Sequence, residues 1–182
     1  MWNDVEPTEV ERSESRPGDQ IVVGADVVMD RGFTVTGAPN DVWPWIVQLG
    51  KQRAGWYLPR RIERVLPAGR RAYRRIEPRW QGLQVGDVIP DYGGRRATFT
   101  VDDLVAPRSL VYRSERRGMQ VSWSIVLRDA STGRAGVVST RVLLRLRLGP
   151  VRRRWLAATG GELIDVATIA GLAAGLRERL AQ

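Results

Sequence analysis

A chain of 182 residues with neither cysteine nor histidine cannot form disulfides or use a thiolate, and it lacks the usual general base and transition-metal ligand. No P-loop and no Gly-x-Gly-x-x-Gly segment enters a helix, so we expect no metal and no cofactor. The net charge is +9, and Lys51 is the only lysine, so arginine supplies almost all of the positive charge.

The N-terminal residues differ in composition from the rest of the chain. Residues 1–19 hold six acidic residues against two arginines, and residues 1–20 offer little to bury, which predicts a disordered acidic leader. A leader of this charge can partly shield the basic remainder. We expect one folded domain over residues 21–182. No apolar run is long enough to span a bilayer and no signal peptide is present, which predicts a cytoplasmic protein.

The first predicted elements are a strand and two helices. Alternating residues predict a strand over 33–36, and the apolar spacing that begins at Val42 predicts a helix over 42–49, ended by Gly50. A second helix is predicted over about 56–66, limited at its start by Pro59. An arginine-rich connection follows it.

The middle of the chain alternates apolar and polar residues with period two, which is typical of strands. Four runs are predicted, over about 97–101, 110–112, 121–127 and 142–148, and their short links favour antiparallel hairpins. The last predicted element is a long C-terminal helix, which opens with a capping box between Thr159 and Glu162. Small residues such as Gly171 and Gly175 would let the sheet approach this helix closely.

These elements predict an α+β domain in which a curved antiparallel sheet is wrapped around the C-terminal helix. Three segments are distinctive: Trp43-Pro44-Trp45, Arg53-Ala54-Gly55-Trp56-Tyr57, and the stretch from Ile76 to Asp87. Over about residues 31–180 the chain resembles the polyketide cyclase/dehydrase-like branch of the SRPBCC superfamily, which includes START domains and the Bet v 1 allergens. The resemblance implies a helix-grip fold with a cavity for lipids, polyketides or other apolar molecules.

Aromatic residues are the candidate ligand contacts, because large rings suit an apolar ligand through buried area and offset stacking. Trp56, Tyr57 and Trp80 belong to the loops that close one end of the cavity in this fold, while Phe99 and Trp123 fall on the inner faces of their strands. We therefore expect binding or carriage of an apolar or aromatic small molecule, gated by residues 55–80. The sequence does not specify an oligomeric state.

Two other functions fit the same sequence. A cyclase- or dehydratase-type enzyme could use the cavity, with Asp102, Tyr57 or an inward-facing arginine as the polar group. Alternatively, an arginine-rich face could bind nucleic acid or an acidic protein. Nucleic acid is the less favoured partner because no helix-turn-helix, zinc-finger or RNP motif is present. The candidate arginines lie on the predicted last strand and after the first helix: Arg141, Arg145 and Arg147, and Arg60, Arg61, Arg64, Arg70, Arg71, Arg74 and Arg75.

Overall fold

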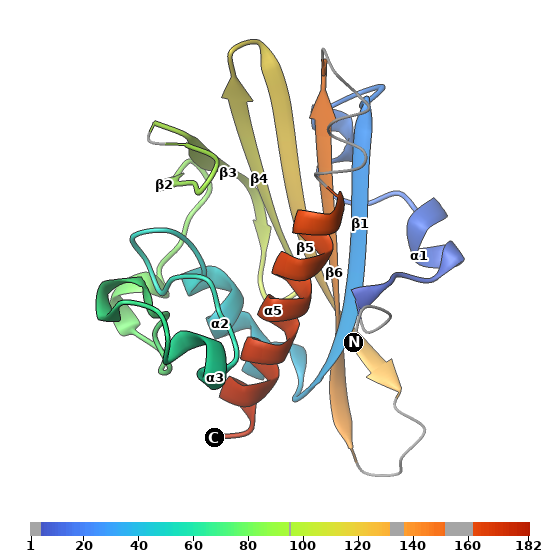
Figure 1. Ribbon diagram of the computed structural model, residues 1–182. Coiled ribbons are helices and arrows are strands. Elements are labelled where there is room, and N and C mark those ends of the chain that lie inside the picture. The colour runs from blue at the N-terminus through green and yellow to red at the C-terminus, as the bar shows by residue number, and fades with distance from the viewer. Residues whose placement is uncertain (1–4, 95, 132–136, 152–161) are drawn as a thin grey trace.

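Six antiparallel strands form one curved sheet in the order β1-β6-β5-β4-β3-β2, with the long C-terminal helix lying across one face (Figure 1). The computed structural model describes residues 5–94, 96–131, 137–151 and 162–182. The strands are β1 (Val27–Thr36), β2 (Val88–Pro90), β3 (Thr98–Val105), β4 (Ser109–Arg116), β5 (Met119–Ser131) and β6 (Val138–Gly149). The predicted sheet and its antiparallel pairing are confirmed, with β2 as an additional edge strand that the sequence pattern did not reveal.

The helices are distributed over both faces of the sheet. The concave face is covered by α5 (Glu162–Leu180) and α2 (Pro39–Gln48), while α1 (Glu9–Ser13) lies on the other side of β1 (Figure 1). Between α2 and β2 run α3 (Arg60–Glu63) and the 3-10 turns η3 (Ala68–Arg70) and η4 (Pro78–Trp80); η2 (Asp19–Ile21) precedes β1. The proposed capping box at Thr159 lies outside the described residues.

The core lies between the concave face of the sheet and the two larger helices. Each strand turns alternate residues inward, as Phe33 on β1 and Val142 on β6 illustrate, because these two residues are buried and are register partners. From α5, Leu172 and Leu176 complete the packing. The period-two pattern therefore predicted correctly which side chains face the helix.

From Val5 onwards the acidic N-terminal segment folds against the sheet, whereas its composition predicts a disordered leader over residues 1–20. A capping box between Thr8 and Glu11 opens α1, and the Val5 side chain is buried. The segment packs on the convex face of the sheet, where its carboxylates meet the arginines of β6. Composition alone missed this because the ordering cost is offset by ion pairs with residues more than a hundred positions away.

The second helix is much shorter than predicted, because α3 covers only Arg60–Glu63. Residues 56–59 are not helical, and the segment around Leu58 crosses α5 at its two glycines. A Cβ atom placed on Gly175 would lie 2.6 Å from the backbone nitrogen of Leu58, and one on Gly171 would lie 2.7 Å from the Leu58 Cδ2 atom. The small residues of α5 do permit a close approach, but at these two positions the neighbour is the segment around Leu58 rather than the sheet.

Candidate functional site

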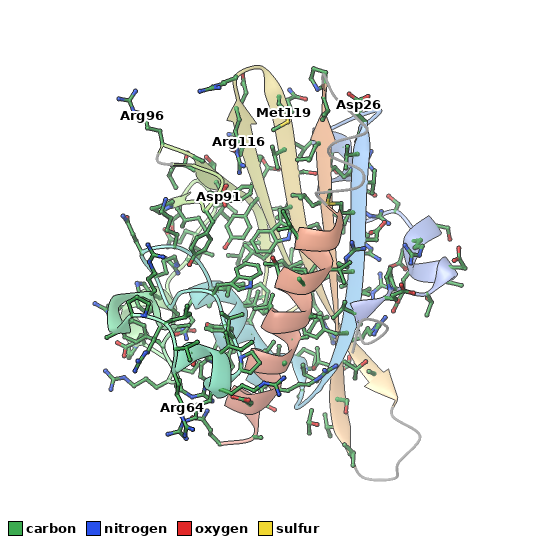
Figure 2. The ribbon with its side chains drawn as sticks, viewed as in Figure 1. Asp26, Arg64, Asp91, Arg96, Arg116 and Met119 are labelled. Atoms are coloured by element: carbon green, nitrogen blue, oxygen red, sulfur yellow. The ribbon has the colours of Figure 1, made fainter. Side chains whose placement is uncertain are left out.

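A pocket of about 510 Å³ opens between the N-terminal half of α5 and the sheet. Its lining is mostly apolar and comes from Trp56, the β2–β3 turn, the strands β3 to β6, and the first half of α5. Figure 2 shows Asp91, Arg116 and Met119 at this end of the sheet. The lining residues are Trp56, Asp91, Tyr92, Gly93, Phe99, Arg116, Met119, Val121, Trp123, Leu146, Leu148, Asp165, Thr168 and Ile169.

One wall of the pocket is a row of aromatic rings that crosses three strands. The ring centroids of Phe99 and Trp123 are 5.9 Å apart, and the fully buried Tyr112 lies 5.6 Å from Trp123. Trp56 stacks on Trp123 at 6.1 Å, and Tyr92 meets Trp56 edge to face at 6.3 Å. These separations are typical of offset or T-shaped aromatic pairs. Four of these five rings line the pocket, and Tyr112 contacts two of them without lining it. This aromatic side is made of residues far apart in the sequence.

Gly55 explains why Trp56 reaches this wall. Its φ of +85° lies in the left-handed region, and the Cα atom of Ala72 would be only 3.0 Å from a Cβ placed on it. The chain therefore turns sharply at Gly55, which sends Trp56 into the pocket and Tyr57 into the core. The Trp56 Nε1 atom donates to the backbone oxygen of Thr168 on α5 at 3.2 Å, which fixes the ring against the helix.

Two carboxylate–arginine pairs supply the charged groups of the pocket. Asp91 pairs with Arg116, whose guanidinium also lies 5.1 Å from the centre of the Phe99 ring. Asp165 of α5 lies 2.8 Å from Arg31, a buried residue on the inner face of β1. Because each pocket carboxylate has an arginine beside it, the charges are balanced locally. A small molecule entering this space would meet apolar walls with polar groups at two defined points.

The structure brings three of the five predicted site residues together. Trp56, Phe99 and Trp123 line the same pocket, whereas Tyr57 and Trp80 do not. Tyr57 is fully buried, donates its hydroxyl to the backbone oxygen of Trp45 at 2.9 Å, and meets the Arg179 guanidinium at 4.4 Å from its ring centre. Burial raises the pKa of this hydroxyl, so it stays protonated and serves as a core hydrogen-bond donor.

Trp80 belongs to the loop but packs away from the pocket. Its ring lies 4.9 Å from that of Tyr73 and is covered by Arg79, whose guanidinium is 4.3 Å from the ring centre. Tyr57 and Trp80 therefore lie outside this pocket, although their place in the loop led us to expect them in the cavity. The direction of side chains in such a loop cannot be predicted from the sequence. Neither the helical period of 3.6 residues nor the strand period of two applies where the backbone turns at Gly55.

Asp102, named for the enzyme alternative, also lies outside the pocket. A register shift between Val101 and Asp103 breaks the regular alternation of β3, and the Asp102 carboxylate pairs with the exposed Arg113 at 2.9 Å. Sequence analysis missed the charged lining residues Asp91, Arg116 and Asp165. The signal available for Arg116 was its place at the end of a strand, two residues before Gly118 in the β4–β5 turn.

The arginines of β6 face the convex side of the sheet, as the alternation predicted, but they are not simply solvated. Arg145 is 4% exposed and binds Asp30 and Asp19, and Arg141 binds Glu11 at 2.8 Å. The anionic partner of this strand is thus the acidic segment of the same chain. Hydrogen bonds from Arg141 lower the pKa of Glu11 to about 2.

The fold is of the helix-grip type, as the sequence resemblance implied, and it contains an apolar pocket. No protein-family model matches the sequence, and comparison with curated proteins finds no relative. Among the described residues, no helix is long and apolar enough to cross a bilayer.

Solved structures do share the fold. A protein from Rhodobacter sphaeroides aligns over 89% of this chain and 97% of its own, with a TM-score of 0.54 and 15% identity. XoxI from Bacillus cereus aligns over 86% of this chain and 96% of its own, with a TM-score of 0.52 and 10% identity. A polyketide cyclase-like protein from Corynebacterium glutamicum is matched more loosely, over 88% and 90% of the two chains, with a TM-score of 0.39 and 13% identity. At these identities the likeness concerns the fold alone.

Proposed function

We propose that this protein binds an apolar or aromatic small molecule in the pocket between the sheet and α5. The observation that carries the proposal is the pocket itself: its volume of about 510 Å³ lies within the roughly 300–1,000 Å³ that is usual for small-molecule sites. Its walls are aromatic and aliphatic, with few polar groups. Such a site gains affinity mainly from the apolar area that the ligand removes from water.

The aromatic wall favours a ligand with a flat or extended apolar body. Trp56 and Trp123 stack with 28° between their planes and Phe99 lies beside Trp123, so several aromatic rings are available to such a ligand. The Asp91–Arg116 pair and the Asp165 carboxylate would orient a polar end of the ligand. Two of the polar groups named for the cyclase-type alternative, Tyr57 and Asp102, lie outside the pocket. The third, an inward-facing arginine, is represented by Arg116, whose charge is already balanced by Asp91, and this favours binding or carriage over the cyclase-type enzyme.

The first test is native mass spectrometry of the purified protein beside a denatured control, to reveal a copurified small molecule. A library of apolar compounds is then titrated while tryptophan fluorescence is recorded. Trp123→Ala removes a ring from the pocket wall, and we expect it to weaken binding at least about tenfold, because central aromatic contacts dominate binding energies.

Trp80→Ala is the matched control, since it deletes the same side chain outside the pocket. The proposal predicts that this variant keeps the affinity of the unmodified protein. Equal weakening in both variants would show that the fluorescence change does not report on the pocket. A clean mass together with no response to any compound would overturn the proposal.

A further inference from the structure

Residues 58–80, which we call the arginine lobe, form a strongly basic projection beside the C-terminal half of α5 (Figure 1). The lobe contains α3, η3 and η4 and carries eight arginines against two glutamates. It lies at the other end of the molecule from the pocket mouth, as the labels of Arg64 and Arg116 in Figure 2 show. The positive charge of the lobe therefore lies on a surface separate from the pocket.

Both glutamates of the lobe are already paired with arginines other than Arg60, Arg61, Arg64 and Arg70. Glu63 is buried and binds Arg179 of α5 at 2.5 Å and Arg74 at 3.0 Å. Glu77 binds Arg75 at 2.5 Å, and its second oxygen lies 3.7 Å from Arg79. These ion pairs attach the lobe to α5 and set its shape, but they leave the outer arginines without an internal counter-charge.

Four arginines point away from the protein. Within the described ranges the side chains of Arg60, Arg61, Arg64 and Arg70 have no hydrogen-bond or ion-pair partner, and all four residues are exposed. At 100° per residue, Arg61 and Arg64 fall roughly 160° and 100° from the buried Glu63 around the α3 turn, whereas Arg60 lies only about 60° from it, at the start of the helix. The result is a surface of uncompensated positive charge held in a fixed orientation.

Exposed aliphatic side chains accompany these cations. Val65 is 82% exposed and Ile62 is 39% exposed, and both belong to the same helical turn as Arg61 and Arg64. Exposed aliphatic groups among arginines suit a membrane interface, where the chains enter the headgroup region while guanidinium groups bind lipid phosphates. They contribute little to the binding of single-stranded nucleic acid, which combines phosphate contacts with base stacking on aromatic rings.

The aromatic residues of the lobe are engaged with each other and with an arginine. Tyr73 and Trp80 meet edge to face, and Arg79 covers the Trp80 ring. A base would have to displace these contacts in order to stack. Among anionic partners, the side chains of the lobe therefore favour a lipid surface over single-stranded nucleic acid.

We propose that the arginine lobe docks on an anionic membrane surface, through Arg60, Arg61, Arg64 and Arg70 with Val65 and Ile62 inserted between them. The lobe is preformed for this contact because Arg71 donates to the backbone oxygens of Leu66 and Arg64, at 2.9 Å and 3.0 Å. Docking requires no ligand in the pocket. Membrane docking is therefore independent of small-molecule binding.

The test is co-sedimentation of the full chain with vesicles of phosphatidylcholine alone and of phosphatidylcholine with phosphatidylglycerol. We expect binding to the anionic vesicles only, weakening as salt is raised. The double variant Arg61→Gln, Arg64→Gln should reduce partitioning about 25-fold, from roughly fivefold for each arginine near an anionic surface. Val65→Ser should reduce it several-fold without any change in charge.

The matched control is Arg96→Gln with Arg117→Gln, which removes the same charge from exposed positions near the pocket end. Circular dichroism establishes that every variant is folded. Unchanged partitioning of the control supports the inference, and equal loss in both double variants would overturn it by attributing binding to net charge. A lack of binding to anionic vesicles would overturn the proposal. It would also be overturned if the protein bound a single-stranded oligonucleotide more tightly than the vesicles and Val65→Ser did not change that affinity.

Discussion

Asp30 and Arg145 are register partners on neighbouring strands, and their side chains meet on the convex face of the sheet with 2.7 Å between Oδ1 and Nε. Both residues are buried there by the acidic N-terminal segment. Asp19 binds a second nitrogen of Arg145 at 2.9 Å, and Arg16 lies 3.3 Å from Asp30. The N-terminal segment thus takes part in a buried charge network that joins it to β1 and β6.

Removing one member of this network should destabilise the fold strongly. Arg145→Met leaves Asp30 and Asp19 without their shared partner in a buried site, and we expect the free energy of unfolding to fall by about 3–5 kcal/mol. Urea denaturation followed by tryptophan fluorescence measures the change. Arg108→Met is the control, because its pair with Asp129 is exposed and should be worth less than about 1 kcal/mol.

Acid should loosen the same segment through Glu11. Its pKa is about 2 in the folded protein, against an ordinary value of 4.5, so the unfolded chain binds more protons between these values. The stabilisation is complete above pH 4.5 and is lost as the pH falls towards 2. Glu11→Gln, which can still cap α1, should unfold more easily at pH 6 and show a flatter dependence of unfolding free energy below pH 4.5.

The control for this acid effect is Glu9→Gln on the same helix. The Glu9 side chain is 97% exposed and its distance to Arg12 is 4.0 Å. We expect the unfolding free energy of the Glu9→Gln variant to equal that of the unmodified protein at every pH. If the unfolding free energy of Glu11→Gln also equals that of the unmodified protein at every pH, the contact between Glu11 and Arg141 does not stabilise the fold.

The two glycines of α5 should respond differently to the same substitution. A Cβ on Gly175 meets backbone atoms of Tyr57 and Leu58 at 2.6 Å, so Gly175→Ala must displace the chain and should cost about 1–3 kcal/mol. A Cβ on Gly171 meets only the end of the Leu58 side chain, which can rotate away. Gly171→Ala should then be neutral or stabilising by up to about 1 kcal/mol from helix propensity. Thermal unfolding of the two variants checks this order.

Neighbouring aromatic residues around Gly55 should separate binding from stability. Trp56→Ala should weaken binding of an apolar ligand while leaving the protein folded. Tyr57→Phe removes the hydrogen bond to Trp45 and should cost about 1 kcal/mol of stability. It should leave ligand affinity unchanged, and a loss of affinity in Tyr57→Phe equal to that in Trp56→Ala would contradict the position of Tyr57 in the core.

The sheet and the terminal helix were predictable because their side chains repeat with the period of the backbone. Trp123 illustrates this, since its alternation with Ser122 and Ser124 placed it on the inner face, where it lines the pocket. The position of Phe99 followed from the same rule. Three of the five predicted site residues lie together because two are on strands and one follows a glycine that fixes its direction.

The remaining features depend on contacts between distant parts of the chain. Nothing local marks Glu11 as the partner of Arg141, or Glu63 as the partner of Arg179, because each pair is separated by more than a hundred residues. The same is true of Asp91 and Asp165, which reach the pocket from a turn and a helix. Composition recorded the charges correctly but could not assign their partners.

The pairing of β1 with β6 also governs the order in which the chain can fold. Val27 is the register partner of Leu148, so the first strand has no neighbour until the last strand exists. The β4–β5 hairpin, by contrast, closes through a short turn between Arg116 and Met119. We expect this hairpin to form early and β1, with its acidic segment, to dock last, since local contacts cost less chain entropy. Pulsed hydrogen exchange during refolding would then show protection of the β4 and β5 amides before those of β1. The N-terminal segment would pack last, on a sheet whose other strands are already paired.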